Sequence, residues 1–173
     1  LDMPNTVPPT TSVELLNQKR ELAKKSVVNY GFHFGSTMDN LNQIKHANNI
    51  ASVKIFMNET TGDLMMNDDT WIAKIFENSK RVSVHAEKEM AEKAVKFIRN
   101  TKNKLYICHI SRESEINYLK KHKLKNKVFV EVTPHHLFLT EEDKNRVGNF
   151  ALMKPELGNK NDQDALWEAL KKG

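Results

Sequence analysis

The sequence predicts an α/β fold in which a parallel sheet curves into a barrel. Short apolar segments rich in β-formers alternate along the chain with charged segments that have a helical period. This alternation is typical of parallel sheets covered by helices. The 173 residues contain no Walker loop and no G-x-G-x-x-G string, so the usual signature of a nucleotide-binding sheet is absent. A barrel therefore explains the pattern better than an open nucleotide-binding sheet.

Five apolar segments are predicted strands because they are short, rich in β-branched and aromatic residues, and flanked by polar residues. They cover residues 27–35, 51–57, 81–86, 105–110 and 127–132. Predicted helices lie between them. The first follows Ser12, a plausible N-cap, and buries Leu15, Leu16 and Leu22; the others cover residues 87–102, 111–122 and 161–172.

Composition excludes several classes of protein. Hydrophobic residues make up 39% and charged residues 28% of the chain, which is ordinary for a globular domain. The net charge is +5, but the lysines are spread along helical segments without interleaved aromatic residues, so we expect no nucleic-acid partner. No apolar segment is long enough for a membrane span, and the single cysteine, Cys108, fits a reducing compartment. We therefore expect a cytoplasmic protein, with residues 1–173 in one domain.

Three candidate metal ligands lie near the predicted carboxyl ends of successive strands. They are Lys54, His85 and His109, each about one strand-helix unit from the next. In a parallel barrel such residues converge on one mouth, and neutral histidines are common zinc ligands. A strand-embedded lysine is unusual because burial of an unpaired ammonium is costly. Reaction of its neutral amine with carbon dioxide would give an anionic carbamate able to bridge two divalent cations.

Several longer strings of residues occur in a fixed order around these positions. They are DMPNT at residues 2–6, KIFMNET at 54–60, VHAE at 84–87, CHI at 108–110, EVTPHHL at 131–137, KPELG at 154–158 and DALWE at 164–168. Their order and spacing resemble dihydroorotase of the amidohydrolase superfamily over essentially the whole chain. The last two strings resemble most the archaeal enzymes and the dihydroorotase domain of the animal multifunctional pyrimidine-synthesis protein.

The resemblance implies a zinc-dependent hydrolase of cyclic amides in pyrimidine biosynthesis. It would reversibly close N-carbamoyl-L-aspartate to L-dihydroorotate. By the family pattern, Lys54 is the carbamylated lysine bridging two zinc ions, and His85 and His109 bind the second of them. Cys108 and Glu131 match positions of an additional zinc site, although packing and orientation are the simpler roles for them.

The resemblance also implies residues that bind substrate. Asn5 corresponds to the asparagine that holds the substrate carboxylate, and Thr60 lies in the loop that covers the substrate. Lys154 begins the segment that holds the pyrimidine ring, where the animal-type enzyme commonly has arginine. A lysine keeps the charge but lacks the fork of donors. His135 and His136 are assigned to packing and hydrogen bonding around the site.

Parts of the family pattern are absent from these 173 residues. The resemblance places strands two to seven of a TIM-like (β/α)₈ barrel here, with strands one and eight missing. The His-x-His pair and its neighbouring arginine would precede Leu1, and the catalytic aspartate would follow Gly173. We therefore expect this partial barrel to be inactive alone, with open strand edges that favour association.

Partners and alternatives follow from the same resemblance. A homodimer and an association with aspartate transcarbamoylase are the expected assemblies. Related hydantoinases and allantoinases share the lysine and histidine layout, but they usually lack the TPHHL string and rank second. A non-catalytic, dihydroorotase-like scaffold is a further alternative, which the retention of Lys54, His85 and His109 argues against.

Overall fold

Five parallel strands form one sheet whose spatial order follows the chain. The computed structural model describes residues 1–122, 124 and 126–173. The strands are β1 (His33–Gly35), β2 (Ser52–Phe56), β3 (Arg81–His85), β4 (Lys104–Ile107) and β5 (Val128–Val130), in the order β1-β2-β3-β4-β5. β1 and β5 are therefore the outer strands of an open sheet within the described part of the chain. The prediction of an α/β fold with a parallel sheet is confirmed.

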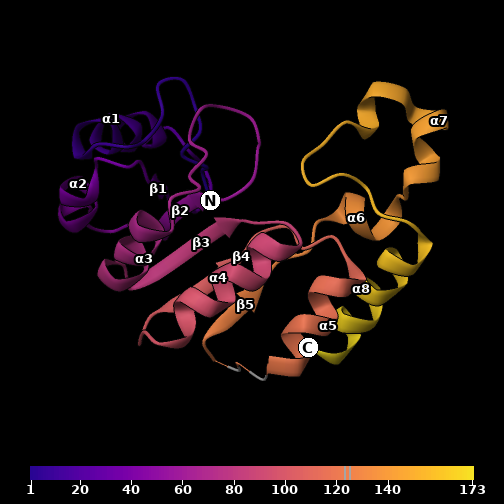
Figure 1. Cartoon of the computed structure of the whole chain (residues 1–173). Helices are drawn as coiled ribbons and strands as arrows, with labels where there is room; N and C mark the ends of the chain where they lie inside the picture. The colour runs from indigo at the N-terminus through magenta and orange to yellow at the C-terminus, as the bar shows by residue number, and fades with distance from the viewer. Residues whose placement is uncertain (123, 125) are drawn as a thin grey trace.

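Helices connect the strands and cover one side of the sheet, as Figure 1 shows. They are α1 (Val13–Ala23), α2 (Leu41–His46), α3 (Asp69–Asn78), α4 (Glu89–Arg99), α5 (Glu113–His122), α6 (Pro134–Phe138), α7 (Lys144–Val147) and α8 (Lys160–Lys172), with 3₁₀ turns η1 (Glu141–Asp143) and η2 (Gly148–Ala151). α5 and α8 lie side by side, and α7 belongs to a lobe that projects beyond α6 (Figure 1). None of the described helices combines the length and the apolar character needed to cross a bilayer.

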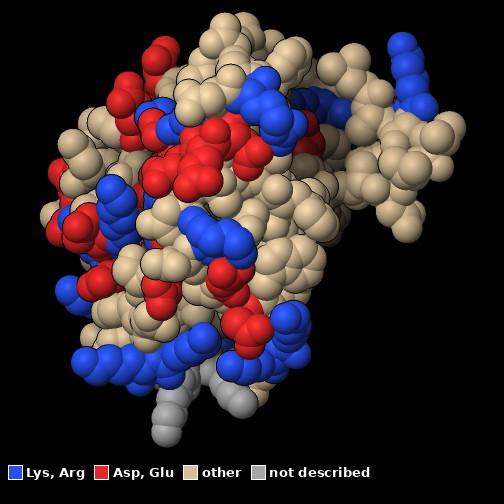
Figure 2. Space-filling model, turned by 90° about the vertical axis from the view of Figure 1, so that its right-hand side faces the viewer, with Lys and Arg blue, Asp and Glu red and all other residues tan. Residues whose placement is uncertain are grey.

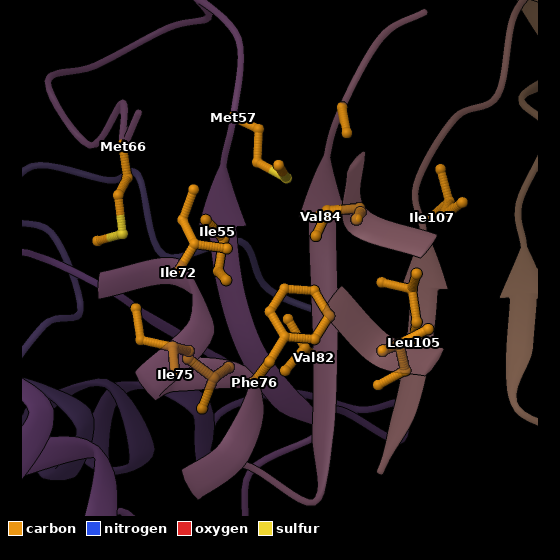
Figure 3. Packing of buried hydrophobic residues seen from close by; sticks show 14 of the residues in the cluster. Ile55, Met57, Met66, Ile72, Ile75, Phe76, Val82, Val84, Leu105 and Ile107 are labelled. Carbon is orange, nitrogen blue, oxygen red and sulfur yellow. The ribbon is translucent and has the colours of Figure 1, made fainter. Parts of the chain in front are cut away.

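The two faces of the sheet have different chemistry because side chains alternate along each strand. Ile55, Val82 and Leu105 belong to the face that packs against α3, where Ile72 and Phe76 are buried (Figure 3). Full burial of an aliphatic side chain of this size contributes about 1.5–3 kcal/mol. The opposite face bears polar side chains at the intervening positions: His33, Ser52, Lys54, Ser83 and His85. The helix-packed face thus fixes the sheet, and the polar face holds the candidate site.

The predicted strand limits lie within one residue of those of β2 and β3, whereas the segments predicted for β1, β4 and β5 are longer than the observed strands. The strand predicted at residues 27–35 begins only at His33. Val27 is 99% exposed, so the apolar character of this segment does not reflect burial. Five strands are observed where the resemblance implied six, and at the amino terminus Asp2 and Phe32 form only an isolated parallel bridge.

The helix predictions near Ser12 and at the three later positions are confirmed in type. The Ser12 side chain accepts a hydrogen bond from the Leu15 amide and begins α1. Leu16 is buried, whereas Leu22 is exposed and not part of the core.

Candidate metal centre

Lys54 lies in the middle of β2 on the polar face, with only 1% of the residue exposed. Its Nζ donates a hydrogen bond to Sγ of Cys108 at 2.9 Å and lies 5.3 Å from the centre of the Phe56 ring. Burial lowers the pKa of Lys54 from its usual 10.5, and the nearby Cys108 only partly opposes this shift. The surroundings therefore shift Lys54 toward the neutral amine, which is the nucleophilic form, without excluding its charged form.

His85 and His109 approach each other from the ends of neighbouring strands. His85 is the last residue of β3, and His109 follows β4 in a turn where its φ is 41°. Nδ1 of His85 lies 3.0 Å from Nε2 of His109. Two nitrogen ligands of one tetrahedral zinc, at bond lengths near 2.0–2.1 Å, would be about 3.3 Å apart. The two nitrogen atoms face each other at hydrogen-bond distance, a little below the separation that two ligands of one zinc ion would have.

Burial keeps the imidazole of His109 neutral. Its pKa is lowered from 6.5 to about 3, first by burial and then by the charges of Lys54 and His85. Because the charge of Lys54 lowers the pKa of His109, the two side chains lie close enough to interact electrostatically. Neutral imidazole is the form that binds a metal ion.

The outward nitrogen of each ring is buried without a hydrogen-bond partner. These atoms are Nε2 of His85 and Nδ1 of His109. Nε2 of His85 is 3.4 Å from Oε1 of Glu87, close to a hydrogen bond but lacking its geometry. Interaction with His85 is the main cause of the lowered pKa of Glu87. Metal-binding histidines commonly direct the second nitrogen at such a carboxylate, so the arrangement fits a metal ion between the rings.

Cys108 and Glu131 both lie beside Lys54, on the side away from α3. Burial raises the pKa of the Cys108 thiol, which disfavours the thiolate needed for metal binding. Glu131 accepts a hydrogen bond from the Tyr106 hydroxyl at 3.0 Å. Burial, followed by this carboxylate, raises the pKa of Tyr106 to about 12. Across the described residues, no three His, Cys, Asp or Glu side chains come together as a metal site, so the additional zinc stays a prediction.

The predicted substrate-binding residues are divided between two places. Asn5 donates a hydrogen bond from Nδ2 to the Thr61 carbonyl at 2.9 Å, so it contacts the loop that contains Thr60. Among the described residues, no hydrogen bond joins Asn5 or Thr60 to the lysine and histidines. Lys154 is exposed, yet its charge helps to lower the pKa of Glu87, which places it near the histidine pair.

Sequence reasoning missed several residues around this centre. Glu87 could have been predicted as a neighbour of the candidate ligand His85, because it follows His85 by two residues. Nothing in the sequence indicated His33. Its Nδ1 lies 2.8 Å from Oγ of Ser52, and that hydroxyl donates a hydrogen bond to Oγ of Ser83 at 2.6 Å, on the same face of the sheet as Lys54. The packing of His136 is as predicted: its Nε2 donates to the Pro155 carbonyl at 3.1 Å.

The fold of this chain is similar to that of solved hydantoinases and of a dihydroorotase-like domain. The L-hydantoinase (dihydropyrimidinase) of Arthrobacter aurescens matches with a TM-score of 0.88 at 20% identity, over 99% of this chain and 47% of that chain. The inactive dihydroorotase-like domain of the CAD-like multifunctional protein of Chaetomium thermophilum matches with a TM-score of 0.78 at 22% identity, over 98% and 50% of the two chains. Five parallel strands related to those of barrel hydantoinases fit a partial barrel.

In sequence, the chain is similar to dihydroorotases along its entire length. The dihydroorotase of Methanosarcina acetivorans is 30% identical over all of this chain and 46% of that protein. The multifunctional protein CAD of Squalus acanthias is 31% identical over 97% of this chain and 8% of that protein. No protein-family model matches the chain. The chain spans about half the length of the curated dihydroorotases it matches.

Proposed function

We propose that this chain is part of a dihydroorotase, a hydrolase of pyrimidine biosynthesis that interconverts N-carbamoyl-L-aspartate and L-dihydroorotate. The observation that supports this most directly is the pairing of His85 with His109 next to a buried Lys54. Similarity to dihydroorotases over the whole chain favours this substrate over hydantoins, since the hydantoinase likeness concerns the fold.

Zinc is the proposed metal, and Lys54 would hold it as a carbamate shared by two ions. The neutral Lys54 amine would attack carbon dioxide, releasing one proton and forming an N-carboxylate. His85 and His109 would bind one of the ions through Nδ1 and Nε2. Bound zinc would supply Lewis acidity to the reacting carbonyl and activate water near neutral pH. Glu87 would hold the His85 ring in orientation.

The substrate would be positioned by groups outside this lysine and histidine cluster. Asn5 would bind its carboxylate, and the loop with Thr60 would cover it. Lys154 would attract the anionic substrate by its charge alone. An ammonium lacks the paired donors with which a guanidinium binds a carboxylate in one plane. Fixed placement of the amide over the metal ions would account for much of the rate.

Partners and compartment complete the proposal. Similarity to a region of multifunctional pyrimidine proteins supports an association with aspartate transcarbamoylase, alongside a homodimer. A cytoplasmic location fits the single cysteine.

Bicarbonate-dependent metal uptake tests the proposed centre. We expect the chain to bind zinc or cobalt more tightly with bicarbonate than without it, and to gain the mass of carbon dioxide at Lys54. Lys54→Ala should abolish both effects, whereas Lys104→Ala, an exposed change on strand β4, should preserve them. Equal metal binding with and without bicarbonate, in the chain and in Lys54→Ala, would contradict the proposal.

A non-catalytic scaffold is the second candidate, because one structural relative is described as an inactive dihydroorotase-like domain. Ring closure and ring opening should be assayed on the complete protein that contains this chain, with dihydroorotate, hydantoin and allantoin as substrates. Turnover of dihydroorotate alone supports the main proposal. Metal uptake without turnover of any of the three supports the scaffold.

A further inference from the structure

The two turns that carry the histidine pair have uncommon backbone conformations. His109 has φ 41°, and Lys88, three residues after His85, has φ 51°. Residues with side chains rarely adopt positive φ, and such conformations persist only where the surrounding structure holds them. The turn after β3 and the turn after β4 therefore need an external support.

Glu115, in the first turn of α5, contacts both turns with one carboxylate. Its Oε1 accepts a hydrogen bond from the Lys88 amide at 2.7 Å. Its Oε2 accepts from the Ser111 amide at 3.1 Å and from the Arg112 amide at 3.0 Å. Only 4% of Glu115 is exposed, so water cannot easily replace these bonds, and a lost bond would leave a buried amide without a partner.

The same turn after β4 is also fixed from its other side. Asp162, at the start of α8, accepts from the Glu113 amide at 2.9 Å and pairs with the Arg112 guanidinium at 3.1 Å. These contacts hold the turn to α8, but they do not reach the turn after β3. Among the described hydrogen bonds to acidic side chains, those of Glu115 alone join the two turns.

We propose that Glu115 is a positioning residue of the metal centre, which sets the distance between His85 and His109 by joining the backbones of their two turns. This inference rests on the proposed function for its catalytic meaning. A carboxylate suits the task because the three facing groups are all N–H donors and both of its oxygens accept. Glutamine in its place would offer one acceptor oxygen, and its amide nitrogen would face an N–H group.

The first experiment needs no metal. Ring nitrogen signals of His85, His109 and His33 are recorded by NMR for the whole chain, for Glu115→Gln and for Glu113→Gln, a control on the exposed side of the same helical turn. We expect Glu115→Gln to shift or split the signals of His85 and His109 and to leave those of His33 unchanged. Amide exchange at Lys88, Ser111 and Arg112 should accelerate at least about tenfold. Glu113→Gln should change neither. Unaltered signals of both rings in Glu115→Gln would overturn the proposal.

The second experiment measures cobalt binding by absorption in the same proteins, in the presence of bicarbonate. We expect Glu115→Gln to weaken binding by about tenfold, the lower end of the range for groups that orient metal ligands, and to alter the cobalt spectrum. Glu115→Asp, which keeps the charge but is one methylene shorter, serves if the glutamine variant does not fold. It should lose affinity as well, because it cannot reach both turns.

The outcomes separate the two proposals. If the unmodified chain binds no cobalt while Glu115→Gln still shifts both rings, the metal centre fails and the positioning role stands. If the chain binds cobalt and Glu115→Gln and Glu115→Asp bind it equally well with the same spectrum, the positioning role fails and the metal centre stands.

Discussion

Lys54 shows how one residue can determine the chemistry of a whole site. A cation held beside a neutral thiol at 2.9 Å receives little compensation for the water it has lost. Burial therefore lowers the pKa of Lys54, and the same burial that disfavours the ammonium favours reaction of the nitrogen with carbon dioxide.

Replacement of Lys54 by methionine should stabilise the metal-free chain. Methionine has a similar length and needs no hydrogen bond, so we expect the free energy of unfolding to increase by about 1–3 kcal/mol. Urea denaturation at neutral pH measures the change, and Lys104→Met provides a control at an exposed site. A less stable Lys54→Met variant would contradict this account of the buried amine.

Titration of His33 should make stability depend on pH. Burial, followed by the charge of Lys54, lowers the pKa of His33 from 6.5 to about 4. Between these values the unfolded chain binds more protons than the folded one, so stability should fall as pH decreases from 6.5 to 4 and should not change from this source above 6.5. His33→Asn should remove about 3 kcal/mol of that dependence. Equal pH slopes for His33→Asn and the unmodified chain in thermal or urea unfolding would refute the prediction.

At the scale of elements, the start of α8 joins separate parts of the site. Asp162 forms a capping box with Asn159, contacts the turn after β4, and lies against the backbone of Gly158. These contacts connect the segment beginning at Lys154 to the turn that carries His109. The helix end therefore contributes to the placement of the site as well as to the fold.

Alanine at Gly158 should disturb this junction. A Cβ there would lie 2.7 Å from both Cβ and Oδ2 of Asp162, closer than packed atoms tolerate, so the cap must move. We expect a loss of about 1–3 kcal/mol in the free energy of unfolding. Asn161→Ala, an exposed change in the same helical turn, is the control for urea denaturation. Equal free energies of unfolding for Gly158→Ala and Asn161→Ala would contradict this prediction.

At the scale of the molecule, the open sheet leaves an apolar groove beside β5. The groove has a volume of about 550 Å³, and its lining includes Ile110, Ile116, Val130, Val132, Leu166 and Leu170. Surfaces of this kind usually mark contacts with other protein segments. The charged surface differs: on the face drawn in Figure 2, acidic and basic side chains lie next to one another instead of forming one basic patch.

The chain should self-associate at high concentration through this groove and the edge of β5. Val130 is 48% exposed on that edge strand, and a lysine there should weaken association by adding charge to the contact. Light scattering over a concentration series measures the effect, with Val28→Lys as the control because Val28 is also exposed but lies before β1. Association that persists in Val130→Lys and disappears in Val28→Lys would contradict the prediction.

Sequence patterns located most elements because burial on one face imposes a period on the residues. The strands at 81–86 and 51–57 were predicted almost to the residue, since both are buried between covering groups. The segment at 27–35 misled the prediction because Val27 and Val28 have strand-forming side chains that no neighbouring element covers. α3 was not predicted, although Asp68 caps its start by accepting from the Trp71 amide and its apolar residues Ile72, Ile75 and Phe76 are buried.

The sequence by itself determined the type of fold, the ligand candidates Lys54, His85 and His109, and the resemblance to dihydroorotases, because residue identities and their order along the chain carry that information. Only the tertiary structure decided that Cys108 is the partner of Lys54, that the two imidazoles meet at 3.0 Å, and that Glu115 joins their turns. These facts depend on distances between segments far apart in the chain, which are fixed by how the helices pack on the sheet and how each buried polar group finds a partner.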